Sequence, residues 1–475
     1  MNWTLLQNSF FVSGLATIFS LAIGFAAALW LAALGPKWRH GFLAGAVIAL
    51  ALPPFQVTNC WLYFLGLTGV WRGWLPWNIY SLGGAVWILT LLTWPISLLA
   101  ALSAWKGIEA AQLECEPALR GTALVRWLLW PTARPSLGLA AALTSVLALN
   151  NFAVPAILQV KVFPAEVWVR FSTNFDATGA LALSWPLLAA PVLLLLLWWR
   201  AEIAWPRQTG SATARAFRRQ LGPGMFWACS LVGIAALCLS VGLPLAQIVS
   251  EERTWTELPK VVRAVRGVIW NSAGFAAATA FACAVLGAVA CRTAKRERGR
   301  VASLSVGLTF SFLWLPLLVP GVLLGIGLIL AFNRPVFEGI YQSAGMVLIA
   351  WTIRFLGLSC NGTALALQAV DHELVDVARL EGAAGWPLWR VAYWPQIAPR
   401  VATAWYLIYL LCLWDVETIV LIYPPGGETL ALRIFNLLHY GHNAQVNALC
   451  LLLLLLAAAP LALWTCGQWL TGRQS

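Results

Sequence analysis

Long apolar runs alternate with short polar segments along the whole chain. A run of about 20 apolar residues is long enough to cross the hydrocarbon core of a bilayer as an α-helix. On this basis the hydrophobic pattern predicts about eleven membrane-spanning helices and hence an all-α integral membrane protein. The predicted spans cover approximately residues 9–34, 42–66, 81–105, 135–160, 180–199, 225–249, 267–291, 302–332, 342–368, 399–422 and 444–468.

The composition agrees with a membrane protein. Hydrophobic residues make up 61% of the chain and charged residues only 10%, whereas soluble domains are roughly half apolar and a quarter charged. Many of the 29 Trp residues lie where apolar runs meet loops, as interfacial anchors do. A net charge of +12 in a soluble protein indicates nucleic-acid binding, but here the basic residues lie in short loops, so no nucleic-acid partner is expected. The ten Cys residues are scattered singly and predict neither a metal site nor disulfides.

Lys and Arg residues are concentrated in alternate loops, chiefly in segments 106–134, 200–219 and 292–300. Loops rich in Lys and Arg face the cytoplasm. This bias predicts that the N-terminus lies outside and the C-terminus in the cytoplasm. On the outer side, residues 251–266 mix charged and apolar positions, which favours either a short surface helix or a plain loop.

A polar stretch in residues 117–135 recurs in residues 381–399, with identical residues at a constant spacing of 264 (395 − 131). Each copy belongs to a cytoplasmic segment of about 30 residues, much longer than a typical connection between helices. Two copies predict two matching contact surfaces for a partner outside the membrane. The shared residues are Gly121, Leu124, Arg126, Trp130, Pro131 and Pro135 in the first copy and Gly385, Leu388, Arg390, Trp394, Pro395 and Pro399 in the second.

The repetition extends beyond this stretch. Further pairs recur at a spacing of 263 (271 − 8): Asn8-Ser9 with Asn271-Ser272, Gly24 with Gly287, and Leu52-Pro53 with Leu315-Pro316. Each half then holds five spans, and an odd number would invert the second copy. The sixth span, 225–249, restores a parallel orientation of the two repeats. We predict a first repeat in residues 1–205, a cytoplasmic linker in residues 206–223, and a second repeat with the linking span in residues 224–475.

Residues 371–383, DHELVDVARLEGA, resemble the E-A-A-x-x-x-G signature of the ABC importer permeases. Asp376 stands where that family usually has Glu, and Ala378 and Gly382 follow it. Pro395 comes 13 residues after Gly382 (395 − 382), as in the family. The resemblance covers nearly the whole chain, and the fused two-copy layout is similar to iron(III), thiamine and putrescine permeases.

The first copy departs from the family pattern. Gln112 and Ala118 occupy the positions of Asp376 and Gly382, and Glu109-Ala110-Ala111 has the letters of the signature out of register. Only the part from Gly121 to Pro135 is retained. The two predicted contact surfaces are therefore not equivalent.

The resemblance implies a MetI-like permease fold in a bacterial plasma membrane, with membrane lipid around it. It also implies a coupling helix that docks into a groove of a separate ATPase homodimer at the cytoplasmic face, and an extracytoplasmic binding protein that delivers the substrate. Positive-inside topology alone is the alternative explanation for the two Arg residues of the repeated stretch. Residues expected to couple to the ATPase are Gly121, Arg126, Pro131, Glu373, Asp376, Ala378, Gly382, Gly385, Arg390 and Pro395.

No G-x-x-x-x-G-K-[ST] sequence occurs in the chain, so ATP is expected on the partner ATPase and not here. No Ser/His/Asp or metal-hydrolase constellation is present, and the chain has only four His residues. We therefore expect a transport subunit without catalytic residues, bound cofactor or metal.

Prolines and ionisable residues inside the spans are candidates for the translocation path. Proline breaks a helix and frees backbone carbonyls that can line a path, although it can also serve helix packing alone. Asp415 belongs to a segment that resembles the iron-type permeases, and it meets either a cation, the binding protein or a structural partner. Arg354 is expected to pair with a helix end or a carboxylate. The path candidates are Pro53, Asn150, Asn151, Pro316, Pro320, Arg354, Asp415 and Glu417.

Ferric iron is the favoured substrate, with thiamine, polyamine and phosphonate compounds as alternatives. The alternatives stay open because in this family the binding protein carries most of the selectivity. A secondary transporter with internal repeats is a rival from another class and predicts uptake driven by an ion gradient without an ATPase. A membrane scaffold without transport activity is a third possibility.

Overall fold

The structure is a computed structural model that describes residues 3–105, 108, 119–174, 178–179, 181, 184–200, 214–296, 312–439 and 445–470. Throughout these ranges the regular elements are helices, and no strand occurs among them. The predicted all-α membrane class is confirmed. Large apolar side chains that project away from the protein, such as Phe281 and Leu231, meet lipid in a bilayer instead of water.

Within the described part of the chain, eight helices are long and apolar enough to cross a membrane. Two further pairs of helices pass the same test jointly, but they bend by 92° and 105° at a short break. The predicted number of eleven is therefore not confirmed. Two predicted spans explain most of the difference: span 302–332 lies partly outside the described residues, and span 180–199 is seen as α11 (Trp185–Arg200), a helix of 16 residues.

The chain divides into two compact units. Unit 1 holds residues 1–176 and 185–254, and unit 2 holds residues 177–184 and 255–475. The predicted division assigned span 225–249 to the second repeat, whereas by packing this segment lies in unit 1. It consists of α13 (Pro223–Leu237), η2 (Cys238–Gly242) and α14 (Leu243–Ser250).

The reason for this grouping is a set of contacts with the first helices of unit 1. Gly233 of α13 packs against the ring of Trp30, and Trp94 Nε1 donates a hydrogen bond of 3.4 Å to Ser240 Oγ of η2. The connection that precedes α13 is α12 (Ala214–Leu221), which packs on α13 and on the start of the first repeated stretch.

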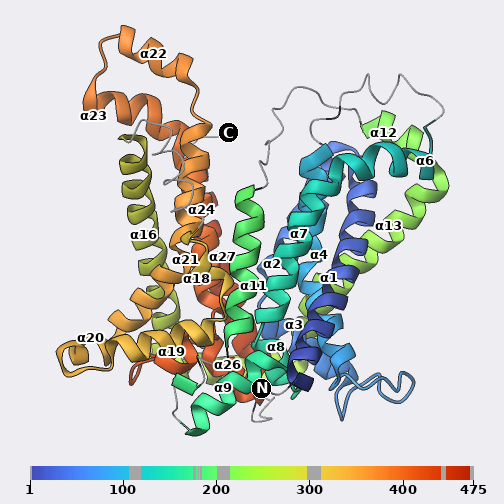
Figure 1. The fold of residues 1–475 in the computed structure, drawn as a ribbon, viewed down its shortest axis with the longest axis vertical. Helices are drawn as coiled ribbons and strands as arrows, with labels where there is room; N and C mark the ends of the chain where they lie inside the picture. The colour runs from blue at the N-terminus through green and yellow to red at the C-terminus, as the bar shows by residue number, and fades with distance from the viewer. Residues whose placement is uncertain are drawn as a thin grey trace. The chain divides into compact units, whose positions relative to one another are not determined.

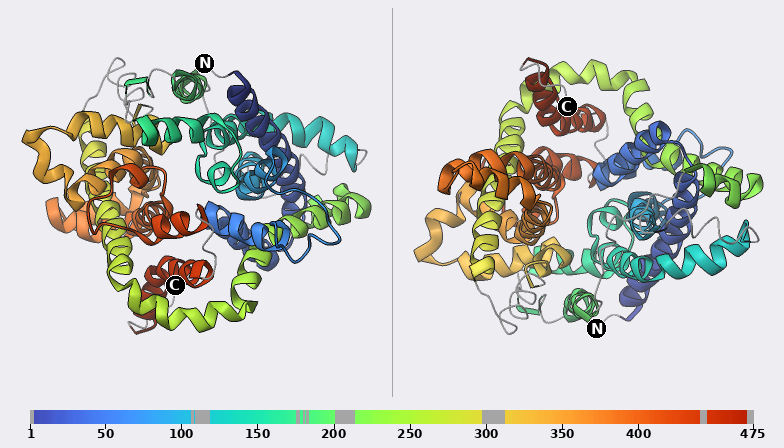
Figure 2. Two further views of the ribbon diagram at one scale, coloured as in Figure 1. Left: turned by 90° about the horizontal axis from the view of Figure 1, so that it is seen from below. Right: turned by 90° about the horizontal axis from the view of Figure 1, so that it is seen from above.

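Three long helices form the core of unit 1: α1 (Trp3–Ala32), α4 (Leu82–Trp105) and α7 (Trp130–Asn150). Each packs against the other two (Figures 1 and 2). α1 and α4 approach closely at Gly24, where an added Cβ would overlap Ser97 Oγ and the Trp94 carbonyl. Ser97 Oγ donates to the Ser20 carbonyl at 2.6 Å, so the missing side chain of Gly24 allows α1 and α4 to bond directly.

Unit 2 repeats this core with α16 (Arg266–Arg296), α21 (Ala344–Gln368) and α24 (Trp394–Trp414). An added Cβ at Gly287 would overlap Ser359, and Ser359 Oγ donates to the Cys283 carbonyl at 2.7 Å. Gly287 and Cys283 follow Gly24 and Ser20 by 263 residues (287 − 24). The internal repeat predicted from the sequence is therefore a repeat of helix packing.

The Asn-Ser pairs at the start of α1 and α16 have matching roles. In each unit, the Asn amide and the Ser hydroxyl hold the backbone at the start of a later helix, α9 (Phe163–Asn174) in unit 1 and α26 (Leu430–His439) in unit 2. The bonds are Asn8 Nδ2 to Lys161 O (3.0 Å), Phe163 N to Ser9 Oγ (2.8 Å), Asn271 Nδ2 to Gly426 O (2.7 Å) and Leu430 N to Ser272 Oγ (2.8 Å).

A broken helix lies beside each core. In unit 1, α2 (Pro36–Ala51) and α3 (Pro54–Leu65) meet at 92°, and Pro53 is the residue that caps α3. In unit 2, α18 (Leu315–Leu318) is followed by α19 (Gly321–Phe332), which Pro320 caps. The sequence alignment paired Pro53 with Pro316, but the structural counterpart of Pro53 is Pro320. Pro316 lies in the first turn of α18, a position where helices tolerate proline.

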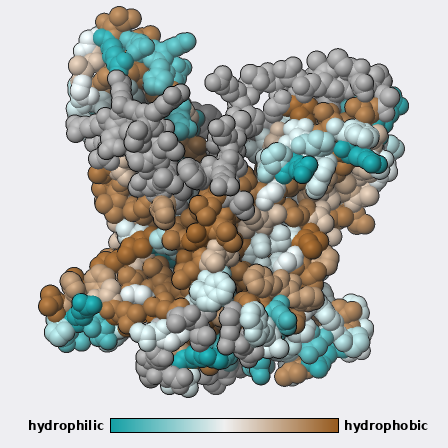
Figure 3. Space-filling view, in the orientation of Figure 1, coloured by the Kyte–Doolittle hydropathy of each residue, from teal (hydrophilic) through white to brown (hydrophobic). Residues whose placement is uncertain are grey.

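The remaining elements are short, except for α27, a candidate membrane span that packs against α24. Most of the predicted segment 251–266 forms a helix, α15 (Glu252–Ala264), and not a plain loop. In Figure 3, hydrophilic residues of unit 2 gather at its two ends, over α22 and near α20, with hydrophobic residues between. The bounds are α6 Thr122–Leu124, η1 Val125–Leu129, α8 Ala153–Ile157, α15 Glu252–Ala264, η3 Pro335–Phe337, α20 Glu338–Tyr341, α22 His372–Leu380, α23 Gly385–Leu388, η4 Trp389–Tyr393, α25 Ile419–Ile422 and α27 Val446–Leu470.

Candidate functional site

The segment that resembles the importer signature forms the short helix α22 at one end of unit 2 (Figure 1). Asp371 caps its first turn, since an Asp371 side-chain oxygen accepts a hydrogen bond of 2.9 Å from Glu373 N. Glu373 lies in the first turn, where a negative charge is favourable. Asp376 pairs with Arg379 one turn later at 2.9 Å, and both side chains are exposed. The sequence therefore encodes a helix that can form on the surface.

Gly382 ends α22 in a left-handed conformation, with φ of 84°. Gly382 N donates to the Arg379 carbonyl and Ala383 N to the Ala378 carbonyl, both at 3.0 Å. This pair of bonds is the Schellman motif, which places glycine at the left-handed position. No atom lies within 4 Å of an added Cβ, so within this chain Gly382 is needed for its backbone angle and not for close approach.

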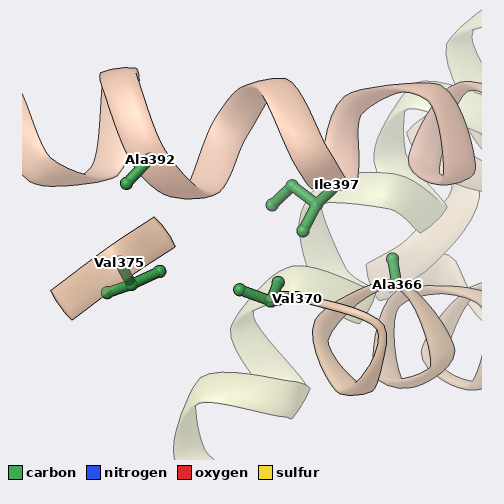
Figure 4. Close-up of a cluster of buried hydrophobic side chains, with 5 residues drawn as sticks. All are labelled: Ala366, Val370, Val375, Ala392 and Ile397. Atoms are coloured by element: carbon green, nitrogen blue, oxygen red, sulfur yellow. The ribbon is translucent and has the colours of Figure 1, made fainter. Parts of the chain in front are cut away.

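One face of α22 is anchored in unit 2. Val375 is fully buried in a cluster with Ala366 of α21, Val370 of the connection between α21 and α22, Ala392 of η4 and Ile397 of α24 (Figure 4). Ala378 packs partly against the same cluster. Ala378 was predicted to serve the ATPase contact, and within this chain its small side chain allows α22 to lie close to η4.

The other side of α22 carries apolar residues that no described part of the chain covers. Leu374, Val377 and Leu380 are 56%, 55% and 89% exposed. These three residues are not among those predicted from the sequence, because the importer signature does not mark the faces of the helix. Their spacing of three residues within a polar segment was the signal that marks such a face.

The second copy of the repeated stretch continues from α22 into α24. Gly385 has φ of 60° and opens a turn that passes through the π-helical η4, where Arg390 is exposed. Pro395 lies in the first turn of α24. Asp371 N donates to Gln396 Oε1 at 2.8 Å, which ties the start of α22 to α24. Three Trp rings stack along this turn: Trp386 on Trp389 at 4.9 Å and Trp389 on Trp394 at 5.0 Å.

The first copy has the same backbone plan. Gly121 has φ of 56°, η1 is a π-helix that contains Arg126, and Pro131 lies in the first turn of α7. Gly121 N donates to the Gln220 carbonyl of α12 at 2.8 Å. Gln112 and Ala118 lie outside the described residues. The repeated Gly, Arg and Pro residues therefore build a common entry into α7 and α24.

A second group of predicted residues meets at the far end of α24. Arg354 of α21 pairs with Asp415 at 3.3 Å and with Glu417 at 3.0 Å, and its Nη1 donates to Thr418 Oγ1. Trp351 Nε1 donates to Asp415 Oδ2 at 2.8 Å. The side chains of Arg354, Asp415 and Glu417 are 11%, 4% and 15% exposed. The expectation that Arg354 pairs with a carboxylate is met by two carboxylates.

The corresponding place in unit 1 holds no charged residues. Asn151 Oδ1 accepts from Val154 N at 3.0 Å, just as Asp415 Oδ1 accepts from Thr418 N at 3.3 Å. This shared bond fixes the register at 264 residues (415 − 151), so Ala153 stands in place of Glu417. Ser97 of α4 and Ser359 of α21 make equivalent bonds to α1 and α16, so these two helices match at a spacing of 262 residues (359 − 97). At this spacing Leu92 stands in place of Arg354 (354 − 92). Asn150, the other polar candidate, is buried beside Asn151.

No group of three or more His, Cys, Asp or Glu side chains among the described residues is placed to hold a metal ion. Asp415 and Glu417 are engaged by Arg354 instead. The arrangement offers a surface helix for a partner at one end of α24 and an ion cluster at the other.

No protein-family model matches the chain, but curated proteins do. The Fe(3+)-transport system permease protein FbpB 2 of Haemophilus influenzae is 20% identical over 475 residues, which cover 97% of this chain and 89% of that protein. PhnV of Salmonella typhimurium, a permease protein assigned to 2-aminoethylphosphonate transport, is 29% identical over 199 residues, 40% of this chain and 72% of PhnV. The putrescine transport system permease protein PotI of Escherichia coli is 27% identical over 194 residues, 40% of this chain and 68% of PotI.

Proposed function

Because this chain is homologous to permease subunits of ABC transporters, which are transport components and not enzymes, we propose that it is the membrane-spanning permease of an ATP-driven importer. In this proposal, both permease halves are fused in one chain in the bacterial inner membrane. A separate ATPase homodimer binds at the cytoplasmic face and carries the ATP. An extracytoplasmic binding protein delivers the substrate.

The single observation that carries the proposal is the construction of α22. The helix is capped at both ends by its own residues, anchored by Val375, and presents Leu374, Val377 and Leu380 on its open side. An apolar helix face of this kind is suited to a hydrophobic groove on a partner. The matching entries into α7 and α24 support a partner that contacts both halves.

Ferric iron is the proposed substrate. FbpB 2, an Fe(3+)-transport permease, aligns with 97% of this chain, whereas PhnV and PotI each align with 40%. The last two support phosphonate and polyamine compounds as alternatives, and thiamine rests on the sequence resemblance alone. We further propose that the helix breaks at Pro53 and Pro320 face the translocation path, since broken helices line such paths in transporters. Asn150, Asn151 and Pro316 remain path candidates from the sequence.

The proposal is tested by reconstituting the purified chain in proteoliposomes, alone and with a candidate ATPase and a candidate binding protein from the same genome. Substrate uptake is expected only when ATP, the ATPase and the binding protein are all present. Uptake by the chain alone under an ion gradient would contradict the proposal and favour a secondary transporter. ATP-dependent uptake with each candidate binding protein then identifies the substrate.

The docking face of α22 gives a first specific prediction. Replacing Leu374→Ser and Val377→Ser together is expected to weaken ATPase binding by about tenfold or more, because each buried apolar side chain contributes roughly 1.5–3 kcal/mol. Binding of the ATPase to the permease in nanodiscs measures the effect. Val336→Ser is the matched control, since Val336 is 88% exposed but lies in η3 near α20, at the other end of unit 2. Unchanged affinity in the double variant would exclude this face from the contact.

A further inference from the structure

α24 connects α22 and η4 at one end of unit 2 with the cluster of Arg354, Asp415 and Glu417 at the other. It begins at Trp394, directly after η4 and the anchored α22, and it ends at Trp414, where Asp415 is the residue that caps it. The helix is continuous for 21 residues, with Pro399 in its second turn. After this proline, a single helix leads to Asp415, so a displacement of α22 and η4 can reach Asp415 along α24.

At the far end, an ion clasp made of Arg354, Asp415 and Glu417 connects α24 to the broken helix. The first residue of α19, Gly321, donates its backbone N–H to Glu417 Oε2 at 3.4 Å. A Cβ added at Gly321 would overlap Arg354 Nη1 and lie 2.7 Å from Glu417 Cβ. Only glycine leaves room for the clasp to close over the start of α19.

Both carboxylates of the clasp have partners within unit 2. Asp415 accepts from the Arg354 guanidinium, from Trp351 Nε1 and from Thr418 N. Glu417 accepts from Arg354 Nη2 and from Gly321 N, and the N-terminus of α19 favours the second negative charge. Both carboxylates are thus used within unit 2, so the cluster is built to connect α21, α19 and α24 and not to wait for a ligand.

Unit 1 shows that the three-helix core does not require such a clasp. At the matching positions it has Leu92, Asn151 and Ala153, yet α1, α4 and α7 pack as α16, α21 and α24 do. Replacing a buried ion pair by residues of lower polarity is often neutral for stability. The charges of unit 2 therefore do something other than support the shared fold.

We propose that Arg354, Asp415 and Glu417 are positioning residues that make the start of α19 move with α24. The inference rests on the proposed importer function: ATPase-driven movement of α22 passes along α24 to the clasp and displaces the break at Pro320. Unit 1 has no ion clasp at the corresponding residues, so the link between the coupling segment and the broken helix is strong in unit 2 and weak in unit 1.

The test gives unit 2 the residues of unit 1. A variant with Arg354→Leu, Asp415→Asn and Glu417→Ala is reconstituted with the ATPase and the binding protein. ATPase binding and ATP hydrolysis are expected to stay within about twofold of wild type. Substrate transported per ATP is expected to fall by about fivefold or more, as for the loss of a typical coupling between sites.

Two further measurements separate positioning from a merely structural role. Spin labels at Leu330→Cys on α19 and Leu407→Cys on α24, both exposed positions, report the distance between the helices by pulsed EPR. In the wild-type background this distance is expected to stay constant through the ATP cycle, and in the triple variant it is expected to vary. Arg354→Lys, which keeps the charge but loses the two-pronged contact, is expected to restore part of the transport per ATP.

Controls make each outcome decisive. Arg433→Leu with Glu428→Gln removes another ion pair of unit 2, joined at 2.9 Å, and is expected to leave transport per ATP unchanged. If the triple variant fails to fold, Gly321→Ala opens the clasp without removing a charge and is expected to give the same loss. Wild-type transport per ATP in a folded clasp variant would overturn the inference, whereas absence of ATP-driven uptake in the wild type would overturn the proposed function.

Discussion

Gly382 shows how a single residue shapes the surface offered to a partner. From the importer signature, Gly382 was predicted to be one of the residues that couple to the ATPase. Within this chain its left-handed φ of 84° closes α22 through two backbone bonds. The same holds for Gly121 and Gly385, whose φ values of 56° and 60° open the paired turns.

Gly382→Ala is therefore expected to destabilise the end of α22 by about 1–2 kcal/mol, because a side chain disfavours left-handed backbone. Hydrogen exchange of the α22 amides measures the local opening, and exchange is expected to rise several-fold. Gly274→Ala is the control: Gly274 lies inside α16 with no atom within 4 Å of an added Cβ. Equal exchange in the two variants would show that the cap is dispensable.

Some residues around α22 could be predicted from the sequence, and others could not. Asp376, Arg390 and Pro395 were placed in the coupling segment from their letters and spacing, and they lie together around α22 and η4. Leu374 and Leu380 were not predicted, because the residue type alone does not show whether a leucine is buried in a core or exposed on a helix face. Exposure, which distinguishes the two, depends on what covers the helix.

At the scale of helices, the two cores are set by matched small residues. Gly24 faces Ser97 and Gly287 faces Ser359, and each Ser bonds to a carbonyl of the facing helix. In a membrane, where lipid is as apolar as the helix surface, close contact between small residues is the main source of helix association. In the sequence, this packing is indicated by the recurrence of Gly24 as Gly287 at the spacing of the repeat.

Gly24→Ala and Gly287→Ala are each expected to lower the apparent melting temperature in detergent by several degrees, because overpacking costs about 1–3 kcal/mol. Scanning fluorimetry on the tryptophan signal measures the shift. Gly14→Ala lies on the same helix as Gly24 but meets open space, and it is expected to leave the melting temperature unchanged or slightly raised. A similar loss in all three variants would point to helix flexibility instead of close packing.

At the scale of the whole molecule, the orientation in the membrane follows from the distribution of Lys and Arg and stays a prediction. It places α22 in the cytoplasm and η3 outside. Eight cysteines of the described part of the chain are free, and all but Cys238 are buried. Cys238 itself belongs to the apolar helix that spans Pro223–Ser250, so a water-borne reagent has little access to the native thiols.

Labelling with a membrane-impermeant maleimide tests this orientation. In a background with Cys115→Ser and Cys466→Ser, Val336→Cys is expected to react in intact spheroplasts. Leu380→Cys is expected to react only in inside-out vesicles. Both positions are strongly exposed, at 88% and 89%, so the two variants serve as controls for each other. The reverse pattern would invert the topology.

The sequence by itself determined the membrane class and the internal repeat and predicted the coupling segment, because each is carried by the order of residues along the chain. Apolar run length, recurring Gly and Pro, and the acidic-Ala-Gly spacing are all local quantities. The tertiary structure alone decided that Pro320 and not Pro316 matches Pro53, that residues 223–250 pack with unit 1, and that Arg354 closes a clasp with Asp415 and Glu417. These outcomes depend on contacts between residues some 60 or more positions apart, where packing selects one partner among many that the sequence allows.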